Sequence, residues 1–454
     1  MITIIVFLGG LSFILFPVIV RRRGVSFVDY YLLFCLYYDI MNTFTNTEGG
    51  SFLFSQQILF TSYGLYYIYA NYQSILKIEK KILSTSLVFL GVVLFGSIYQ
   101  GLTLKLSVLS FTSFFSSMAM LPIAYHHYAT KGRIENLLRS VFLFTIILVS
   151  VIIIFTIFKV DSKYYGSSDT LWQSSSSPGG ILYFGNLGLR GGFTYIGFLV
   201  LLFPILFYQK NIPKYMLYLV LIFLLLVMVL SFKRFAFFTV LFGFLTYMFS
   251  NLTSRNLKFL LLIGSLSIFT ILILFTNVSD IAGARYKERG GDQFVGIEGI
   301  ENDIRFFEIF IVYEEIQNSF ESLLFGKQAG RHISIGSMGF SKDTWGVHST
   351  YANFLLNYGF VGLISYLLIF YYLYKIVRKK YKLLIKKAKN NSILIKSYAH
   401  YWLLFRTLFL VFLFAGMVGG TVKITIGGLV FIVLGAIGGH IYKQSRNIIA
   451  TDSM

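Results

Sequence analysis

Five cationic side chains stand at the edges of apolar segments or inside them, where a charge has a cost. Arg190 lies in LGLRGGF, Lys233 and Arg234 lie in SFKRFAF, and Arg305 and Arg406 follow further along the chain. An arginine fork binds phosphate oxygens bidentately and stays protonated, so these residues predict a cationic pocket for a phosphorylated lipid. The alternative is that each side chain snorkels to the surface or pairs with a nearby acid.

His348 is the histidine best placed for proton transfer. It precedes Ser349 and Thr350, two favourable helix N-cap residues, at the start of an apolar run. The positive end of a helix dipole favours the neutral imidazole, which accepts a proton near neutral pH. The alternative is a histidine that only caps or packs. His332, in a polar segment before it, is expected to matter far less.

The composition indicates that these residues belong to a membrane protein. The chain is 56% hydrophobic and 19% aromatic, only 13% of it is charged, and its mean hydropathy is +0.73. Soluble proteins carry roughly a quarter charged residues. The single cysteine, Cys35, excludes an internal disulfide and a cysteine metal cluster. The net charge of +20 fits basic cytoplasmic loops better than nucleic-acid binding, because no basic soluble module is present.

Apolar runs of the length that crosses a bilayer recur along the whole chain. They predict an all-α, polytopic bundle of about 12–13 spanning helices. The first run is expected to be a retained span, because no small-residue cleavage site precedes the arginines that follow it. The runs cover residues 2–20, 26–41, 52–71, 82–100, 104–125, 137–158, 181–208, 213–231, 235–250, 257–276, 349–374, 398–416 and 421–442.

Lys and Arg are concentrated in every second connection between these runs. Basic connections stay in the cytoplasm, which predicts an N-terminus outside and a C-terminus inside. The most basic connection is 375–396. The others lie at 21–23, 77–81, 131–139, 210–214, 255–258 and 443–446.

The long segment 277–347 is expected on the opposite, extracytoplasmic side. It carries seven Lys or Arg and eleven Asp or Glu, and separates a bundle at 1–276 from helices at 348–454. A long polar insertion in a compact protein is usually functional. Within it, 303–324 predicts one amphipathic helix that Gly326 stops, with its apolar stripe on the membrane surface or on the bundle. The chain shows no internal repeat, which disfavours a transporter made of inverted halves.

Four short motifs, in chain order, resemble those of the O-antigen polymerase and O-antigen ligase superfamily. They cover roughly 181–375, and their placement before and after the long loop is similar to the family's. The motifs are Arg190-Gly191-Gly192-Phe193, Ser231-Phe232-Lys233-Arg234, Arg305 followed by Leu324-Phe325-Gly326, and His348 followed by Gly359 and Gly362.

This resemblance implies a membrane-embedded glycosyltransferase of the C type at the outer face of the plasma membrane, acting on undecaprenyl-diphosphate-linked glycans. It implies that Arg190, Arg234 and Arg305 bind the diphosphate and that His348 acts on the acceptor hydroxyl, with Lys233 and Arg406 as supporting candidates. Arginines stabilise a diphosphate leaving group without a metal, and no cofactor is implied. A chain-length regulator and a flippase are the protein partners that it suggests, beside the lipid bilayer.

Two alternatives stay open. A polymerase is favoured over an O-antigen ligase, which shares the donor and differs in the acceptor. A lipid-linked oligosaccharide flippase or other transporter would have short loops on both sides and charges at the bilayer midplane.

Overall fold

The protein is mostly helical, and the computed structural model shows three helical segments long and apolar enough to cross a membrane. These segments are Thr61–Tyr99, Thr350–Lys386 and Tyr398–Met417, and Ile196–Leu206 and Lys214–Leu225 form shorter apolar helices. The chain is therefore a membrane protein, as its composition predicts. The structure describes residues 28, 31, 50–99, 104–157, 192–207, 212–231, 234–248, 304–327, 332–334, 344–347, 349–387, 392–418 and 424–451.

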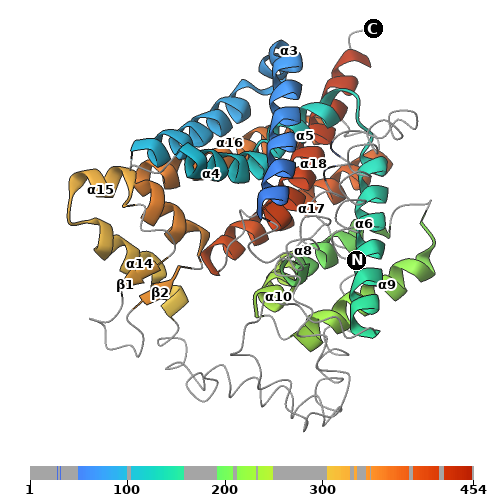
Figure 1. Cartoon of the computed structure of the whole chain (residues 1–454). Coiled ribbons are helices and arrows are strands. Elements are labelled where there is room, and N and C mark those ends of the chain that lie inside the picture. Colours follow the sequence, from blue (N-terminus) through green and yellow to red (C-terminus); the bar gives the residue numbers. More distant parts are fainter. Residues whose placement is uncertain are drawn as a thin grey trace.

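Described helices overlap most of the predicted apolar runs, and Figure 1 shows their arrangement. The predicted runs 2–20 and 257–276, and nearly all of 26–41, lie outside the described residues. Those before the long loop are α3 (Gly50–Tyr99), α4 (Leu104–Met118), α5 (Met120–Thr130), α6 (Ile134–Ile157), α8 (Gly192–Leu206), α9 (Lys214–Ser231) and α10 (Arg234–Met248). The later elements are α14 (Ile304–Ile316), α15 (Phe320–Phe325), β1 (His332–Ser334), β2 (Thr344–Gly346), α16 (Thr350–Lys387), α17 (Ser392–Val418) and α18 (Ile424–Thr451).

Helix α3 joins two of the predicted runs, 52–71 and 82–100, through a sharp break. Glu79 has φ −153° and ψ 78°, which no helix accommodates. The limbs before and after it run in different directions (Figure 1). The basic stretch 77–81 therefore forms a helical corner where the sequence predicts a connection.

The predicted run 104–125 is divided between α4 and α5, which continues to Thr130. Pro122 explains the division, because it has no N–H to donate to the carbonyl of Met118. Ala119, between the two helices, keeps right-handed helical angles of φ −65° and ψ −21°. The chain is thus interrupted in its hydrogen bonding without reversing direction.

Helices α5 and α18 are in close backbone contact within the main core. A Cβ at Gly435 would lie 2.5 Å from the carbonyl oxygen of Leu121, and one at Gly439 would lie 2.2 Å from that of Tyr125. Glycines four residues apart allow two helix backbones to approach, as in small-residue contacts within membranes. A large apolar core shared by α3–α6, α8–α10 and α16–α18 surrounds this contact.

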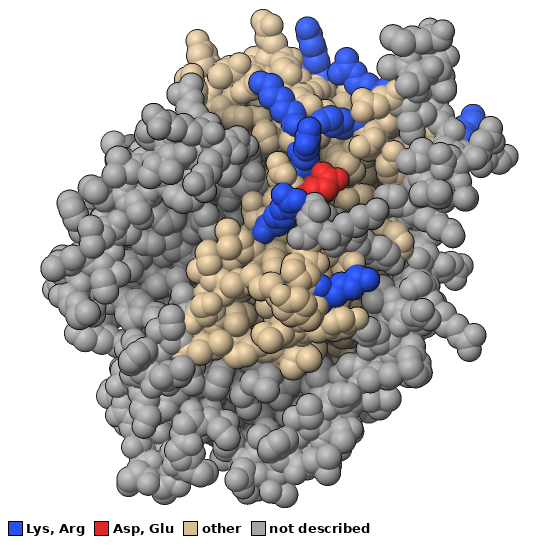
Figure 2. All heavy atoms as spheres, turned by 90° about the vertical axis from the view of Figure 1, so that its right-hand side faces the viewer, with Lys and Arg blue, Asp and Glu red and all other residues tan. Residues whose placement is uncertain are grey.

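One end of the bundle gathers several of the predicted basic connections. The Lys81 ammonium lies 5.4 Å from the ring centre of Tyr372, and the Lys380 ammonium lies 4.5 Å from that of Tyr442. Lys443 donates to the carbonyl of Gly132 at 3.4 Å. Figure 2 shows Lys and Arg side chains gathered on the upper part of the described surface, the end toward which α18 runs in Figure 1. We call this region the basic end.

At the basic end, the last helix turn of α16 lies further along the chain than the sequence predicts. The segment 375–396 was expected to connect two spans, but α16 continues as a helix to Lys387. Lysine and arginine favour helices, and cations near the C-terminus of a helix are stabilised by its dipole. The long basic helix therefore extends beyond the apolar part of α16.

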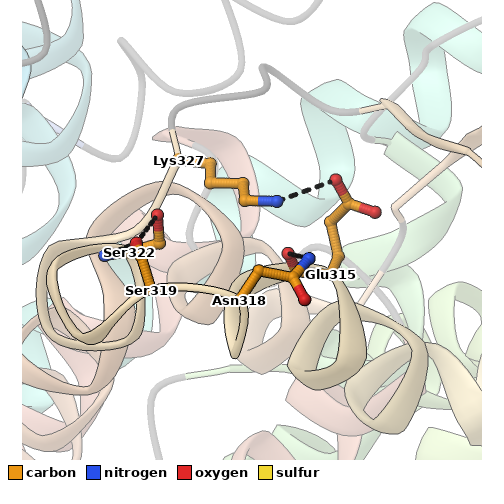
Figure 3. Close-up of polar contacts among 5 residues, drawn as sticks. All are labelled: Glu315, Asn318, Ser319, Ser322 and Lys327. Carbon is orange, nitrogen blue, oxygen red and sulfur yellow. Dashed lines mark hydrogen bonds and ion pairs between the residues drawn. The ribbon is translucent and has the colours of Figure 1, made fainter.

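The predicted amphipathic helix 303–324 is wrong as a single element. It forms α14 and α15, separated by a turn at residues 317–319. Ser319 caps α15 by accepting a hydrogen bond from the N–H of Ser322 at 3.0 Å (Figure 3). The predicted stop at Gly326 is confirmed, with its N–H bonded to the carbonyl of Ser322 at 2.8 Å. We call residues 304–327 the loop module.

Candidate functional site

The start of α16 is hydrogen-bonded to two other helices, α17 and α14. Ser349 caps it, since its hydroxyl accepts from the N–H of Ala352 at 3.4 Å and donates to the carbonyl of Gly416 at 3.2 Å. The Tyr351 hydroxyl donates to the carbonyl of Leu413 at 2.6 Å. The predicted N-cap is confirmed. The Ser349 hydroxyl also donates to one of the last carbonyls of α17, which lack partners within their own helix.

Glu308 of α14 completes this cap from another helix. Its carboxylate accepts the N–H of Ser349 at 2.6 Å, and its side chain is fully buried at 0% exposure. In a capping box, a Glu three residues after the cap accepts the cap residue's own N–H. Ala352 occupies that position here, so the carboxylate comes from the loop module instead.

A second contact joins the loop module to α16 about two turns later. Gly359 interrupts α16 with φ 60° and ψ −161°, and Gly326 has φ 79° and ψ 176°, both in a region that only glycine adopts readily. A Cβ at Gly359 would lie 2.3 Å from the backbone of Leu324. The N–H of Lys327 bonds to the carbonyl of Leu356 at 2.8 Å, an acceptor that the interruption frees.

A small apolar core lies between these two contacts. It joins the buried side chains of α14 to those of the first turns of α16 and is separate from the main core. Part of the predicted apolar stripe, including Ile311 and Ile316, therefore packs against a bundle helix, whereas Phe310, Tyr313 and Phe320 are exposed. The buried members of this core are Ile311, Val312, Ile316, Val347, Ala352, Leu355 and Leu356.

Two short strands precede α16 and were not predicted. β1 and β2 pair antiparallel, with His332 opposite Gly346 and Ser334 opposite Thr344. The loop module and both strands lie together on one side of the bundle (Figure 1). His332, expected in an irregular loop, thus belongs to a ladder that ends just before His348.

The structure describes some of the predicted site residues. Arg190, Lys233 and His348 lie outside the described residues. Arg234 begins α10 and Arg305 lies in the first turn of α14, each described in its backbone only.

Arg406 is described fully and does not join the start of α16. Its side chain is exposed on α17, ten residues before Gly416. Ten residues of helix span about 15 Å. The structure therefore gives no support to a role for Arg406 at the start of α16.

What the structure brings together is the segment that carries Arg305 and the segment that follows His348. Glu308, one turn after Arg305, binds the residue directly after His348. Helix α10, which begins at Arg234, reaches the same part of α17, because Phe242 stacks on Phe414 with ring centres 4.8 Å apart.

Sequence reasoning missed Glu308, although a signal was present. Glu308 stands four residues after Ile304 and three before Ile311, which places an acid within the apolar stripe of its helix. A buried carboxylate must be compensated by hydrogen bonds or charge, so an acid in a stripe predicts a partner.

Metal ligands do not gather in the part of the chain that the structure describes: no group of three or more His, Cys, Asp or Glu could hold an ion there. The chemistry of the described site consists of a carboxylate, hydroxyls and backbone groups. A scan against protein-family models finds no match for this chain, and no curated protein matches it.

Proposed function

We propose that this chain is a membrane-embedded glycosyltransferase that polymerises undecaprenyl-diphosphate-linked oligosaccharide repeat units at the outer face of the plasma membrane. The product is a surface polysaccharide. The proposal starts from the four motifs, and the contact between Glu308 and Ser349 carries it further. That contact joins the helix of Arg305 to the helix that follows His348, two segments to which the resemblance gives complementary roles.

The second contact supports the same reading. Leu324-Phe325-Gly326 and Gly359 belong to two separate motifs of the resemblance, and their backbones touch. Both glycines adopt angles that a side chain would strain. A physical requirement for glycine at each place agrees with motifs that contain glycine there.

In the proposed reaction, an acceptor sugar hydroxyl attacks the anomeric carbon of the donor glycan. His348 takes the hydroxyl proton, the bond between the anomeric carbon and the phosphate oxygen breaks, and lipid diphosphate leaves with the electron pair. Arg190, Arg234 and Arg305 stabilise the negative charge on that leaving group. Preorganised cations contribute most where water is excluded.

The basic end supports the proposed orientation. Lys81, Lys380 and Lys443 meet there. Tyr99, at the far end of the same helix as Lys81, donates to Glu321 of the loop module. The limb 80–99 thus runs from the basic end to the loop module, which supports the proposal that the two regions lie on opposite sides of the membrane. Basic segments are retained in the cytoplasm, so the loop module faces outward.

Deleting the gene in its host tests the proposal directly. A polymerase predicts that the envelope glycan is capped at one repeat unit, and that lipid-linked single units accumulate. Retained lipid-linked polymer with no surface attachment would instead indicate a ligase. Loss of surface glycan with lipid-linked single units trapped on the cytoplasmic side would indicate a flippase. Gel electrophoresis of surface glycan and mass spectrometry of the lipid-linked pool separate these outcomes.

Complementing the deletion with variants assigns the residues. His348→Ala should lower polymerisation about 10²–10⁴-fold at normal protein level, the usual contribution of a positioned acid–base group. His348→Gln can hydrogen-bond but cannot take a proton, so substantial activity would leave orientation as the only role. Arg305→Lys should fail nearly as badly as Arg305→Ala, because lysine lacks the bidentate fork.

A further inference from the structure

Glu308 has the features of a residue that acts through another. It is fully buried, it lies on the loop module, and its carboxylate bonds to a backbone group of α16. The position that it occupies is normally filled from within the same helix, by the last residue of a capping box. The start of α16 is therefore complete only when α14 is docked on it.

We infer that Glu308 is a positioning residue for the proposed site, completing the cap of α16 and thereby fixing the start of the helix that follows His348 relative to α14, the helix of Arg305. The inference rests on the proposed function for its readout of activity. It goes beyond that function because the resemblance gives no role to an acid at this place.

The hydrogen bond from the N–H of Ser349 to Glu308 stabilises the start of α16. The N–H of Ser349 is one of the first donors of α16, which have no acceptor within their own helix. A buried donor without an acceptor is destabilising, and a bond to a charged group is stronger than a bond to a neutral one. The positive end of the α16 dipole further favours a carboxylate at this point.

The surrounding contacts fix the position of the start of α16. Ser349 is also bonded to α17 through Gly416, and Ile311 and Val312 of α14 pack against the first turns of α16. Three helices are therefore fixed to one another at a single residue. His348 directly precedes Ser349 in the chain, so a shift of Ser349 acts on it through the backbone.

Three variants separate the effects of the carboxylate. Glu308→Ala removes the acceptor, Glu308→Asp shortens it, and Glu308→Gln keeps an acceptor oxygen without the charge. Glu315→Ala is the matched control, because Glu315 lies on the same helix and its partly exposed side chain bonds to Lys327 of the loop module (Figure 3). The full-length protein in lipid nanodiscs is used throughout.

Hydrogen exchange measures the contact without reference to activity. In Glu308→Ala, amides of the first turns of α16 should exchange faster than in the wild type, whereas Glu308→Gln and Glu315→Ala should resemble the wild type. Unchanged exchange in the alanine variant would overturn the capping role. If the alanine variant does not fold, the same comparison is made with Glu308→Asp.

Kinetics with lipid-linked repeat units then tests positioning. Glu308→Ala should lower kcat about 10²-fold, the effect of a small misplacement, with little change in KM. Glu308→Gln should stay within about tenfold of the wild type, because a neutral bond replaces a charged one. Full activity of Glu308→Ala would overturn the inference.

A double variant separates positioning from general structural support. In the His348→Ala background, Glu308→Ala should cost less than about threefold more, since residues acting as a unit are not additive. Losses that multiply would show that Glu308 does not act through His348. Wild-type protein that transfers no sugar would refute the proposed function, while the exchange experiment would still decide whether Glu308 caps α16.

Discussion

The contact between α5 and α18 and the contact between the loop module and α16 hold the molecule in different ways. The first joins two helix backbones through Gly435 and Gly439 inside a large apolar core. The second has a small apolar core and depends on polar groups at helix ends and interruptions, such as Glu308 with Ser349 and Lys327 with Leu356.

Because of this difference, the stability of the bundle and the position of the start of α16 depend on different contacts. Apolar packing in the main core is spread over many side chains, so it sets whether the protein folds. The contacts of the loop module use single donors and acceptors, so one substitution can shift the start of α16 while the bundle stays folded. Elements that carry chemistry are often of the second kind, held on a rigid scaffold.

Gly439→Ala should have the largest effect on stability. Its Cβ would meet the carbonyl oxygen of Tyr125 at 2.2 Å and the N of Ala129 at 2.9 Å, and neither backbone atom can move alone. Overpacking of this kind costs about 1–3 kcal/mol and sometimes more. Thermal unfolding of the purified protein in detergent should show a marked fall in Tm.

Gly91→Ala is the control for this prediction. A Cβ at Gly91, within α3, has no atom within 4 Å. Alanine favours a helix over glycine by roughly 0.5–1 kcal/mol, so this variant should be neutral or slightly more stable. Equal Tm values for the two alanine variants would contradict the proposed importance of the close α5–α18 contact.

Gly359→Ala should disturb the loop module more than the bundle. Its φ of 60° costs a residue with a side chain about 1–3 kcal/mol, and its Cβ would lie 2.3 Å from the backbone of Leu324. We expect faster hydrogen exchange at residues 320–327 and lower polymerisation, with protein levels largely kept. Loss of the folded protein altogether would mean that the two regions are not separable.

His126 should make stability depend on pH at the basic end. Its Nδ1 lies 3.0 Å from the Tyr67 hydroxyl and its Nε2 lies 2.9 Å from the Ser74 hydroxyl. Burial, with smaller contributions from His127 and Lys131, lowers the pKa of His126 from 6.5 to about 4. The unfolded chain therefore binds a proton first as pH falls, and stability declines between about pH 6.5 and 4.

The decline from this group should be on the order of 1–2 kcal/mol at pH 5. Tm measured at pH 7.5, 6 and 5 should fall, and His126→Asn, which cannot titrate, should flatten the profile. A steeper profile in the asparagine variant would contradict a neutral, buried His126.

The sequence predicted the helices better than it predicted the interruptions and contacts between them. Apolar runs located the described helices, and a cap at Ser349 or Thr350 and a stop at Gly326 were predicted because these residue types have local effects. The interruption at Gly359 was missed because it depends on the loop module meeting α16, whereas the division of α14 from α15 was missed although Ser319 offered a local N-cap signal. Contacts between distant segments have no local signature in one sequence.

Two missed features did leave traces that a pattern search could use. Gly435 and Gly439 have the spacing of a close helix contact within an apolar segment. Glu308 interrupts an apolar stripe, which calls for a buried partner. The partner itself could not be predicted, because Ser349 offers a backbone N–H and any residue type has one.

The smallest effect is expected at the ion pair on the surface of the loop module. Lys327 donates to Glu315 at 3.2 Å, with both side chains partly exposed (Figure 3). Such pairs contribute about 0–1 kcal/mol, because solvent screens them and two long side chains must be ordered. Lys327→Ala removes the pair but keeps the backbone bond to Leu356. Its Tm and its polymerisation should stay close to those of the wild type, at both low and high salt. A loss as large as that of Gly359→Ala would mean that side-chain charge, and not backbone capping, holds the loop module on α16.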